Sequence, residues 1–139
     1  MNLPEIKNYS EKAMSNHYDL FVLSKGLNVG KPLEKPCPNC FVIHCKSWRQ
    51  YETFKAILYT CWKANAFDAY LHGSVIPYIR ISDFKTVVYD KASKAYRNYR
   101  QFENDFQRYL ELEKYEASIA KQLQLIRELK QVYIMRHIK

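Results

Sequence analysis

The sequence has little glycine and proline, and its C-terminal part has none. All three glycines and all five prolines lie within the first 77 of its 139 residues, and both residue types commonly end helices. We therefore expect a compact domain over residues 14–88 and a helical arm over residues 89–139. Residues 1–13 are expected to form a separate N-terminal segment.

Long apolar runs are also absent, so no segment is predicted to cross a membrane. Residues 1–5 lack the basic and apolar stretches of a secretory signal, and we therefore expect a cytoplasmic protein. In that compartment the four cysteines are expected to be reduced thiols or metal ligands. The hydrophobic fraction of 47% is too high for a disordered chain and predicts a folded core.

The charge balance is basic, with 22 lysines and arginines against 14 acids and a formal charge of +8. Aromatic residues make up 15% of the chain, and twelve of them are tyrosines. This combination suits a polyanion-binding surface, because basic residues release counterions and tyrosines stack and donate to phosphates. The alternative is an aromatic core inside a protein whose basic excess only maintains solubility.

The compact domain contains two β-favouring runs, residues 18–23 and 40–44. Ser47 and Gln50 form a capping-box pattern that predicts a helix start. Apolar residues then recur at steps of three and four, and the helix is expected to end near Gly73. Residues 75–81 are predicted to form a third strand, at a sheet edge because they include Pro77. The expected fold class is α+β, with short strands and one packed helix before the arm.

In the arm, apolar residues recur at helical spacing, but the pattern drifts between residues 110 and 116. Such a pattern is typical of a helical hairpin or an imperfect coiled coil, so the arm is expected to be a hairpin or a single helix. An apolar stripe of this length must be covered, and we expect association with a second copy or with another protein. The predicted association stripe comprises Tyr99, Phe102, Phe106, Ile119, Leu123, Ile126 and Tyr133.

The loop between the first two strands holds all but one of the candidate binding residues. Its run from Gly26 to Pro32 has three residues between the glycines, and Pro32 replaces the magnesium-binding hydroxyl of a nucleotide loop, so nucleotide binding is not expected. Lysines recur through the loop and favour contacts with a nucleic-acid backbone, while asparagines would reach base edges or order the loop. A solvated basic loop is the alternative. The candidate nucleic-acid-binding residues are Lys25, Asn28, Lys31, Lys35, Asn39 and Arg80.

Cysteine and histidine spacing does not complete a recognised site. Cys37 and Cys40 form one CxxC pair, followed by His44 and Cys45, whereas structural zinc sites usually take two such pairs. Structural thiols are the preferred interpretation, with a metal site or a redox pair as alternatives. Because the four histidines are scattered and no nucleophile motif occurs, we expect no catalytic residues, no metal and no cofactor.

The order of predicted elements over residues 58–85 is similar to that in a known kind of protein domain. A helix leads to the Gly73-Ser74 turn, a short predicted strand and the Asp83-Phe84 step, and a long helix follows. This arrangement is similar to the closing segment of a target-recognition domain with its spacer helix in type I restriction–modification specificity subunits. Together with the runs 25–32 and 36–41, the whole chain also resembles an uncharacterised family of small bacterial mobile-element proteins.

The resemblance implies a DNA-binding platform whose helical arm binds a second copy or a methyltransferase-like partner. Specificity subunits carry two recognition domains, whereas this chain has room for one shortened domain, which dimerisation would complete. We therefore expect a non-catalytic DNA-binding or modulator protein that resembles a truncated specificity subunit. The alternative is a mobile-element adaptor or inhibitor that binds protein without binding DNA.

Overall fold

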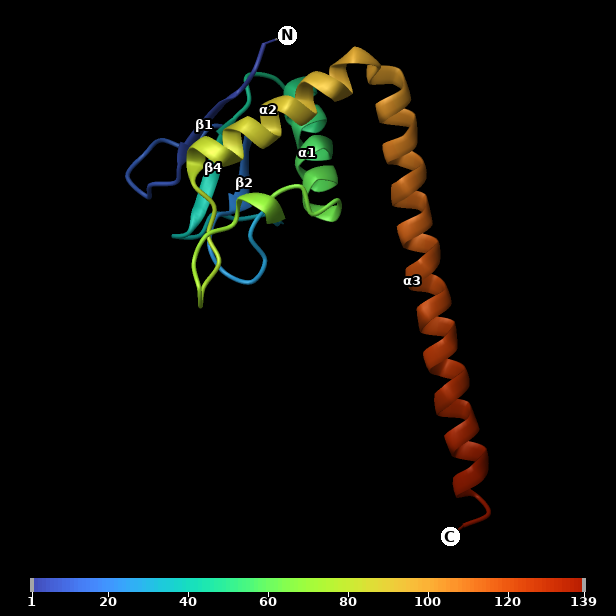
Figure 1. The fold of residues 1–139 in the computed structure, drawn as a ribbon. Coiled ribbons are helices and arrows are strands. Elements are labelled where there is room, and N and C mark those ends of the chain that lie inside the picture. Colours follow the sequence, from blue (N-terminus) through green and yellow to red (C-terminus); the bar gives the residue numbers. More distant parts are fainter. Residues whose placement is uncertain (1, 139) are drawn as a thin grey trace. The chain divides into compact units, whose positions relative to one another are not determined.

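The computed structural model describes residues 2–138 and combines a four-stranded antiparallel sheet with α-helices, which confirms the α+β class (Figure 1). The strands are β1 (Glu5–Asn8), β2 (Asp19–Leu23), β3 (Pro32–Leu33) and β4 (Cys40–His44). The helices are α1 (Trp48–Lys63), α2 (Ile81–Arg97) and α3 (Tyr99–Met135), with a short 3-10 helix, η1 (Asp68–Tyr70), after α1. The chain divides into a globular unit, which ends at Tyr99, and a helical unit, which begins at Arg100.

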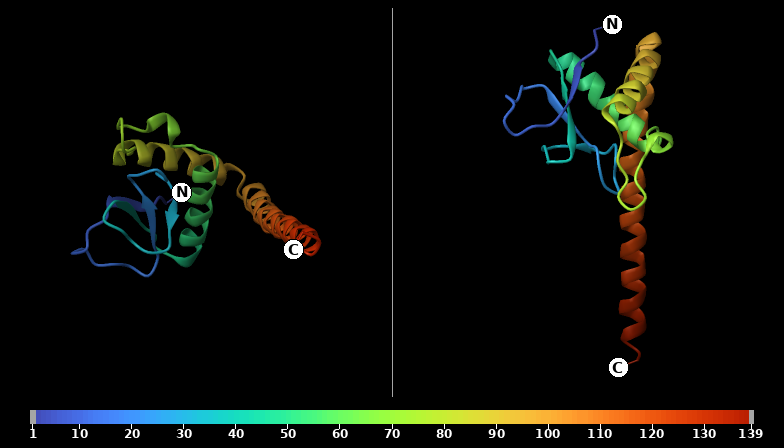
Figure 2. Two further views of the ribbon diagram at one scale, coloured as in Figure 1. Left: turned by 90° about the horizontal axis from the view of Figure 1, so that it is seen from below. Right: turned by 60° about the vertical axis from the view of Figure 1, so that its left-hand side comes forward.

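The core of the globular unit lies between the sheet and two helices. The strand order is β1-β4-β2-β3, and α1 packs against β2 and β3 while α2 packs against β1. Figure 2 shows both helices on one side of the sheet. Along β1, β4 and β2, every second side chain points to that face, and the strand register places these side chains next to one another. They are all buried: Ile6, Leu20, Val22, Phe41 and Ile43. Phe84 of α2 packs on Phe41 with ring centres 4.7 Å apart.

Helix α1 starts as the capping pattern predicts. The Ser47 hydroxyl accepts the Gln50 backbone N–H at 3.1 Å, and the Gln50 side chain accepts the Lys46 N–H at 2.7 Å. In an ordinary capping box this side chain accepts the backbone N–H of the cap residue itself. Here it accepts the N–H of Lys46, the residue before the cap.

The predicted end of this helix near Gly73 is wrong, because α1 ends at Lys63. Asn65 takes the left-handed conformation there, with φ 54°. Its N–H donates to Trp62 O at 3.1 Å, and the Ala66 N–H donates to Cys61 O at 2.9 Å. These two bonds make a Schellman ending, in which asparagine takes the position that usually belongs to glycine.

The predicted strand at residues 75–81 is also wrong. Residues 72–78 form a hairpin closed by a bridge between His72 and Tyr78, and Ile81 already begins α2. Gly73 adopts φ 94°, and a side chain there would place its Cβ 2.3 Å from Ile76 O. The backbone of this segment pairs within the hairpin and with residues 24–26, directly after β2, and does not form a strand of the sheet.

Two helices, not the one expected, pack in the globular unit. Helix α2 includes residues that were assigned to the arm, but it buries Phe84, Val87, Val88, Ala92 and Ala95. The two units therefore meet after Tyr99, later than the expected boundary after residue 88. Between α2 and α3 only Asn98 departs from helical geometry.

The arm proves to be a single helix rather than a hairpin. Helix α3 runs without interruption from Tyr99 to Met135 and has no buried residue. Within residues 2–138, none of the helices combines the length and apolarity that crossing a bilayer requires.

Candidate nucleic-acid interface

Three loops meet at the end of the sheet where β2 ends and β4 begins (Figure 1). Backbone hydrogen bonds connect them: the Ser24 N–H donates to Asn39 O at 2.9 Å, and the Gly26 N–H donates to Pro77 O at 2.8 Å. The Ile79 N–H returns to Ser24 O at 3.1 Å. These bonds join segments that are far apart in the sequence. We call residues 24–31, 34–39 and 72–80 the loop cluster.

The loop cluster contains all six residues that the sequence analysis selected, and all six are exposed. They are Lys25, Asn28 and Lys31 in the first loop, Lys35 and Asn39 in the second, and Arg80 after the hairpin. The same segments contain one acid, Glu34. Four cations and one carboxylate give these segments an excess of positive charge, the kind of charge distribution that favours polyanions.

The first loop is attached to the core through Gly30. This glycine is buried and has φ 92°, and a Cβ on it would lie 2.4 Å from the Phe67 ring. Phe67 in turn stacks on Phe84 of α2, with ring centres 5.2 Å apart. The next residue, Lys31, places its Nζ 5.8 Å from the centre of the Trp62 ring. The Lys31 ammonium is therefore held near an aromatic face rather than left fully mobile.

Sequence reasoning missed the apolar tips of this cluster. Leu27 is 93% exposed at the tip of the first loop, and Val75 and Ile76 are 86% and 52% exposed in the hairpin. Their apolar character and their place near turn glycines were visible in the sequence. That the two turns are neighbours is shown only by long-range backbone pairing, such as the bond between Gly26 and Pro77.

The cysteines take ordinary structural positions. Cys40 Sγ donates to Cys37 O at 3.0 Å across the CxxC turn, and burial raises the Cys40 pKa. Cys45 and Cys61 are buried, and loss of solvation raises the pKa of each thiol to about 12. Among residues 2–138, no three His, Cys, Asp or Glu side chains gather in a way that could hold a metal ion.

Two histidines contact carboxylates in different parts of the globular unit. His44 Nδ1 lies 2.7 Å from Asp19 Oδ1, across the pair of strands β4 and β2. His72 Nε2 lies 3.6 Å from Asp83 Oδ2 and connects the hairpin with α2. Each contact joins two elements of the fold.

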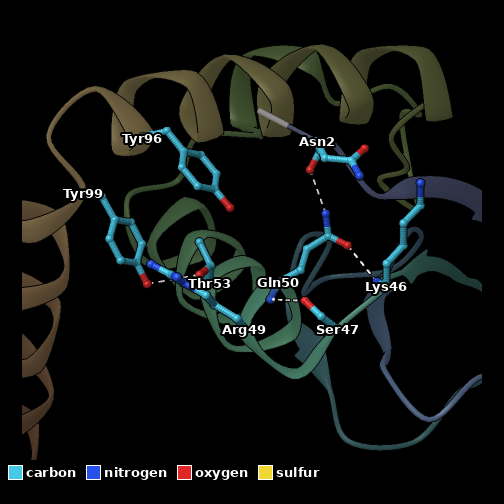
Figure 3. Close-up of a pocket in the computed structure, with 8 residues that line it drawn as sticks. All are labelled: Asn2, Lys46, Ser47, Arg49, Gln50, Thr53, Tyr96 and Tyr99. Atoms are coloured by element: carbon cyan, nitrogen blue, oxygen red, sulfur yellow. Dashed lines mark hydrogen bonds between the residues drawn. The ribbon is translucent and has the colours of Figure 1, made fainter.

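A pocket of about 360 Å³ lies at the start of α1, at the opposite end of the sheet from the loop cluster (Figure 3). Its polar groups largely contact one another: the Thr53 and Tyr99 hydroxyls are 3.1 Å apart, and the Gln50 amide donates to Asn2 O at 2.7 Å. Burial raises the Tyr96 pKa above its ordinary value. The lining residues are Asn2, Lys46, Ser47, Arg49, Gln50, Thr53, Tyr96 and Tyr99.

The predicted association stripe falls on two faces of α3. At about 100° per residue, Tyr99, Phe102 and Phe106 lie on one side, whereas the four later positions lie roughly half a turn away. Tyr99 also contacts Thr53 within the globular unit. The later positions are Ile119, Leu123, Ile126 and Tyr133, which are between 46% and 57% exposed.

One protein family matches the chain: a family of unknown function (DUF6943) matches residues 6–136. The match spans both the loop cluster and all of α3. No curated protein and no solved structure matches the chain.

Proposed function

Because the chain belongs to DUF6943, a family of unknown function, we propose its function from its own residues: non-catalytic DNA binding through the loop cluster. The observation that carries the proposal is that Lys25, Lys31, Lys35 and Arg80 all lie in the loop cluster. These cations come from three loops that backbone hydrogen bonds hold together, and all four are exposed. In this proposal they contact phosphates, while Asn28 and Asn39 reach base edges or order the loop.

The electrostatics give the proposal a measurable consequence. Each phosphate contact to B-DNA releases counterions and contributes about −0.9 to the slope of log K against log salt. Four contacts give a slope of about −3.6, which is a modest footprint suited to one small domain. Because phosphate contacts carry no sequence information, most of the affinity is expected to be independent of sequence.

We propose that α3 supplies the assembly function. Leu112, Ile119, Ile126 and Tyr133 are separated by seven residues each, the spacing of one position in a coiled coil. A second copy, packed along this line, would place two loop clusters in one particle. In this form the protein would resemble a truncated restriction specificity subunit, and a methyltransferase-like protein is the other partner that the resemblance suggests.

The experiment is a titration of a fluorescent duplex at several salt concentrations, starting near 50 mM. The variant K25E/K31E/K35E should weaken binding and flatten the slope to about −1, because three contacts are lost. The control K12E/K114E/K121E makes the same change in net charge at exposed lysines outside the loop cluster and should keep most of the slope. If the unaltered protein shows no salt-dependent binding to DNA near 50 mM salt, the proposal is wrong.

The second candidate function is that of a mobile-element adaptor or inhibitor that binds protein only. It is favoured by one observation, the absence of any buried residue on the long helix α3. It requires the apolar positions of α3 and does not require the loop cluster, so substitutions in each place separate the two functions.

A further inference from the structure

The loop cluster exposes aliphatic side chains in two of its turns. Leu27 and Val75 are 93% and 86% exposed, and Ile76 is 52% exposed. They come from two turns that lie side by side, since Gly26 donates to Pro77 and Lys25 pairs with Tyr78. Single exposed apolar residues are common, but neighbouring exposed tips mark an interaction surface.

These tips are surrounded by groups that favour nucleic acid. Lys25 precedes the first tip by two residues, and the Asn28 amide directly follows Leu27. Ser74 precedes Val75 in the second tip, and Arg80 follows the hairpin. The aliphatic tips therefore have hydrogen-bonding and cationic residues close to them in the sequence.

We propose that Leu27, Val75 and Ile76 form an apolar wedge that enters the minor groove of DNA and partly unstacks one base step. This inference rests on the proposed DNA-binding function and adds the groove and the mode of contact. Proteins that insert aliphatic side chains between bases bend the duplex, because the wedge opens the step on the minor-groove side. The flanking cations then contact phosphates on the two sides of the groove.

An anionic membrane is the competing occupant, because basic residues around apolar tips also bind lipid headgroups. Two observations favour DNA. The three tip side chains are aliphatic, whereas interfacial anchors are enriched in tryptophan and tyrosine. Asn28 and Ser74, directly beside the tips, suit base edges better than hydrocarbon, where an unpaired amide is costly.

The test uses the full chain and a short duplex with 2-aminopurine at a flexible T-A step and a fluorophore pair at its ends. Binding of the unaltered protein should raise the 2-aminopurine fluorescence, because unstacking removes its quenching, and should shorten the end-to-end distance. The variant L27S/V75S/I76S should bind on the order of tenfold more weakly and leave the duplex straight, while its salt slope stays near that of the unaltered protein. The control M14S changes another exposed side chain, 94% exposed, and should behave as the unaltered protein.

The outcomes separate this inference from the function on which it rests. Salt-dependent binding without bending or 2-aminopurine signal overturns the wedge and leaves DNA binding intact. Equal bending by the triple serine variant also overturns the wedge. Failure to bind any duplex overturns both proposals, and so does tip-dependent binding to vesicles with phosphatidylserine in place of DNA.

Discussion

The contact between Gly30 and Phe67 predicts how strongly the loop cluster depends on the core. Gly30 and Gly26 both have positive φ, 92° and 117°, so alanine at either position costs roughly 1–2 kcal/mol of backbone strain. Only at Gly30 would the new Cβ meet the Phe67 ring, at 2.4 Å; at Gly26 nothing lies within 4 Å. Overpacking of this kind adds roughly 1–3 kcal/mol.

Gly30→Ala should therefore lower the free energy of unfolding by roughly 2–5 kcal/mol, and Gly26→Ala by roughly 1–2 kcal/mol. Urea denaturation followed by tryptophan fluorescence measures the difference in the globular unit, because Trp48 and Trp62 both lie there. Introducing Phe67→Leu should shrink the effect of Gly30→Ala, since the substitution removes the ring that the Cβ meets. Equal losses for the two glycine variants would refute the reasoning.

Three further predictions concern the cap, the thiols and the long helix. Ser47→Ala should destabilise the globular unit by about 1 kcal/mol in the same assay, because the Gln50 N–H loses its acceptor, and Ser47→Asp should restore the cap. At pH 8 a maleimide should label Cys45 and Cys61 only after unfolding, because both thiols have a pKa of about 12 in the folded protein and the reactive thiolate is scarce. Between about pH 9 and 12 these thiols ionise in the unfolded chain but not in the folded protein, so the free energy of unfolding should fall as the pH rises. Leu123→Asp with Ile126→Asp should reduce the oligomer mass in light scattering while a single loop cluster still binds DNA; unchanged mass would exclude this face of α3 as the assembly surface.

The sequence was a good guide where local signals agreed with the tertiary structure. The run Cys40–His44 is β4 with the bounds expected, and the run at residues 18–23 matches β2 to one residue. Both strands are rich in β-branched or aromatic residues. Each also has a neighbouring strand along both of its edges. The cap at Ser47 was equally readable, because capping is a local contact.

The sequence-based predictions failed where contacts between residues distant in the sequence determine the structure. Strand β1 contains Glu5, Lys7 and Asn8, which have weak β propensity, and it exists through its pairing with β4. Helix α2 has no side-chain cap at its start, so nothing in the sequence marked Ile81 as its first residue. In the candidate site, the cations were selected from the sequence by their charge, but the meeting of their loops depends on long-range backbone bonds such as the bond between Ser24 and Asn39.

Main-chain hydrogen bonds connect the three loops of the loop cluster to one another. Its three connecting bonds use the N–H groups of Ser24, Gly26 and Ile79, and all three acceptors are backbone carbonyls. Side chains at positions such as 27, 28 and 75 are therefore replaceable without dismantling the turns. The cluster would serve as a scaffold for selection experiments, in which a library randomised at these positions explores new ligands while every member keeps the parent fold.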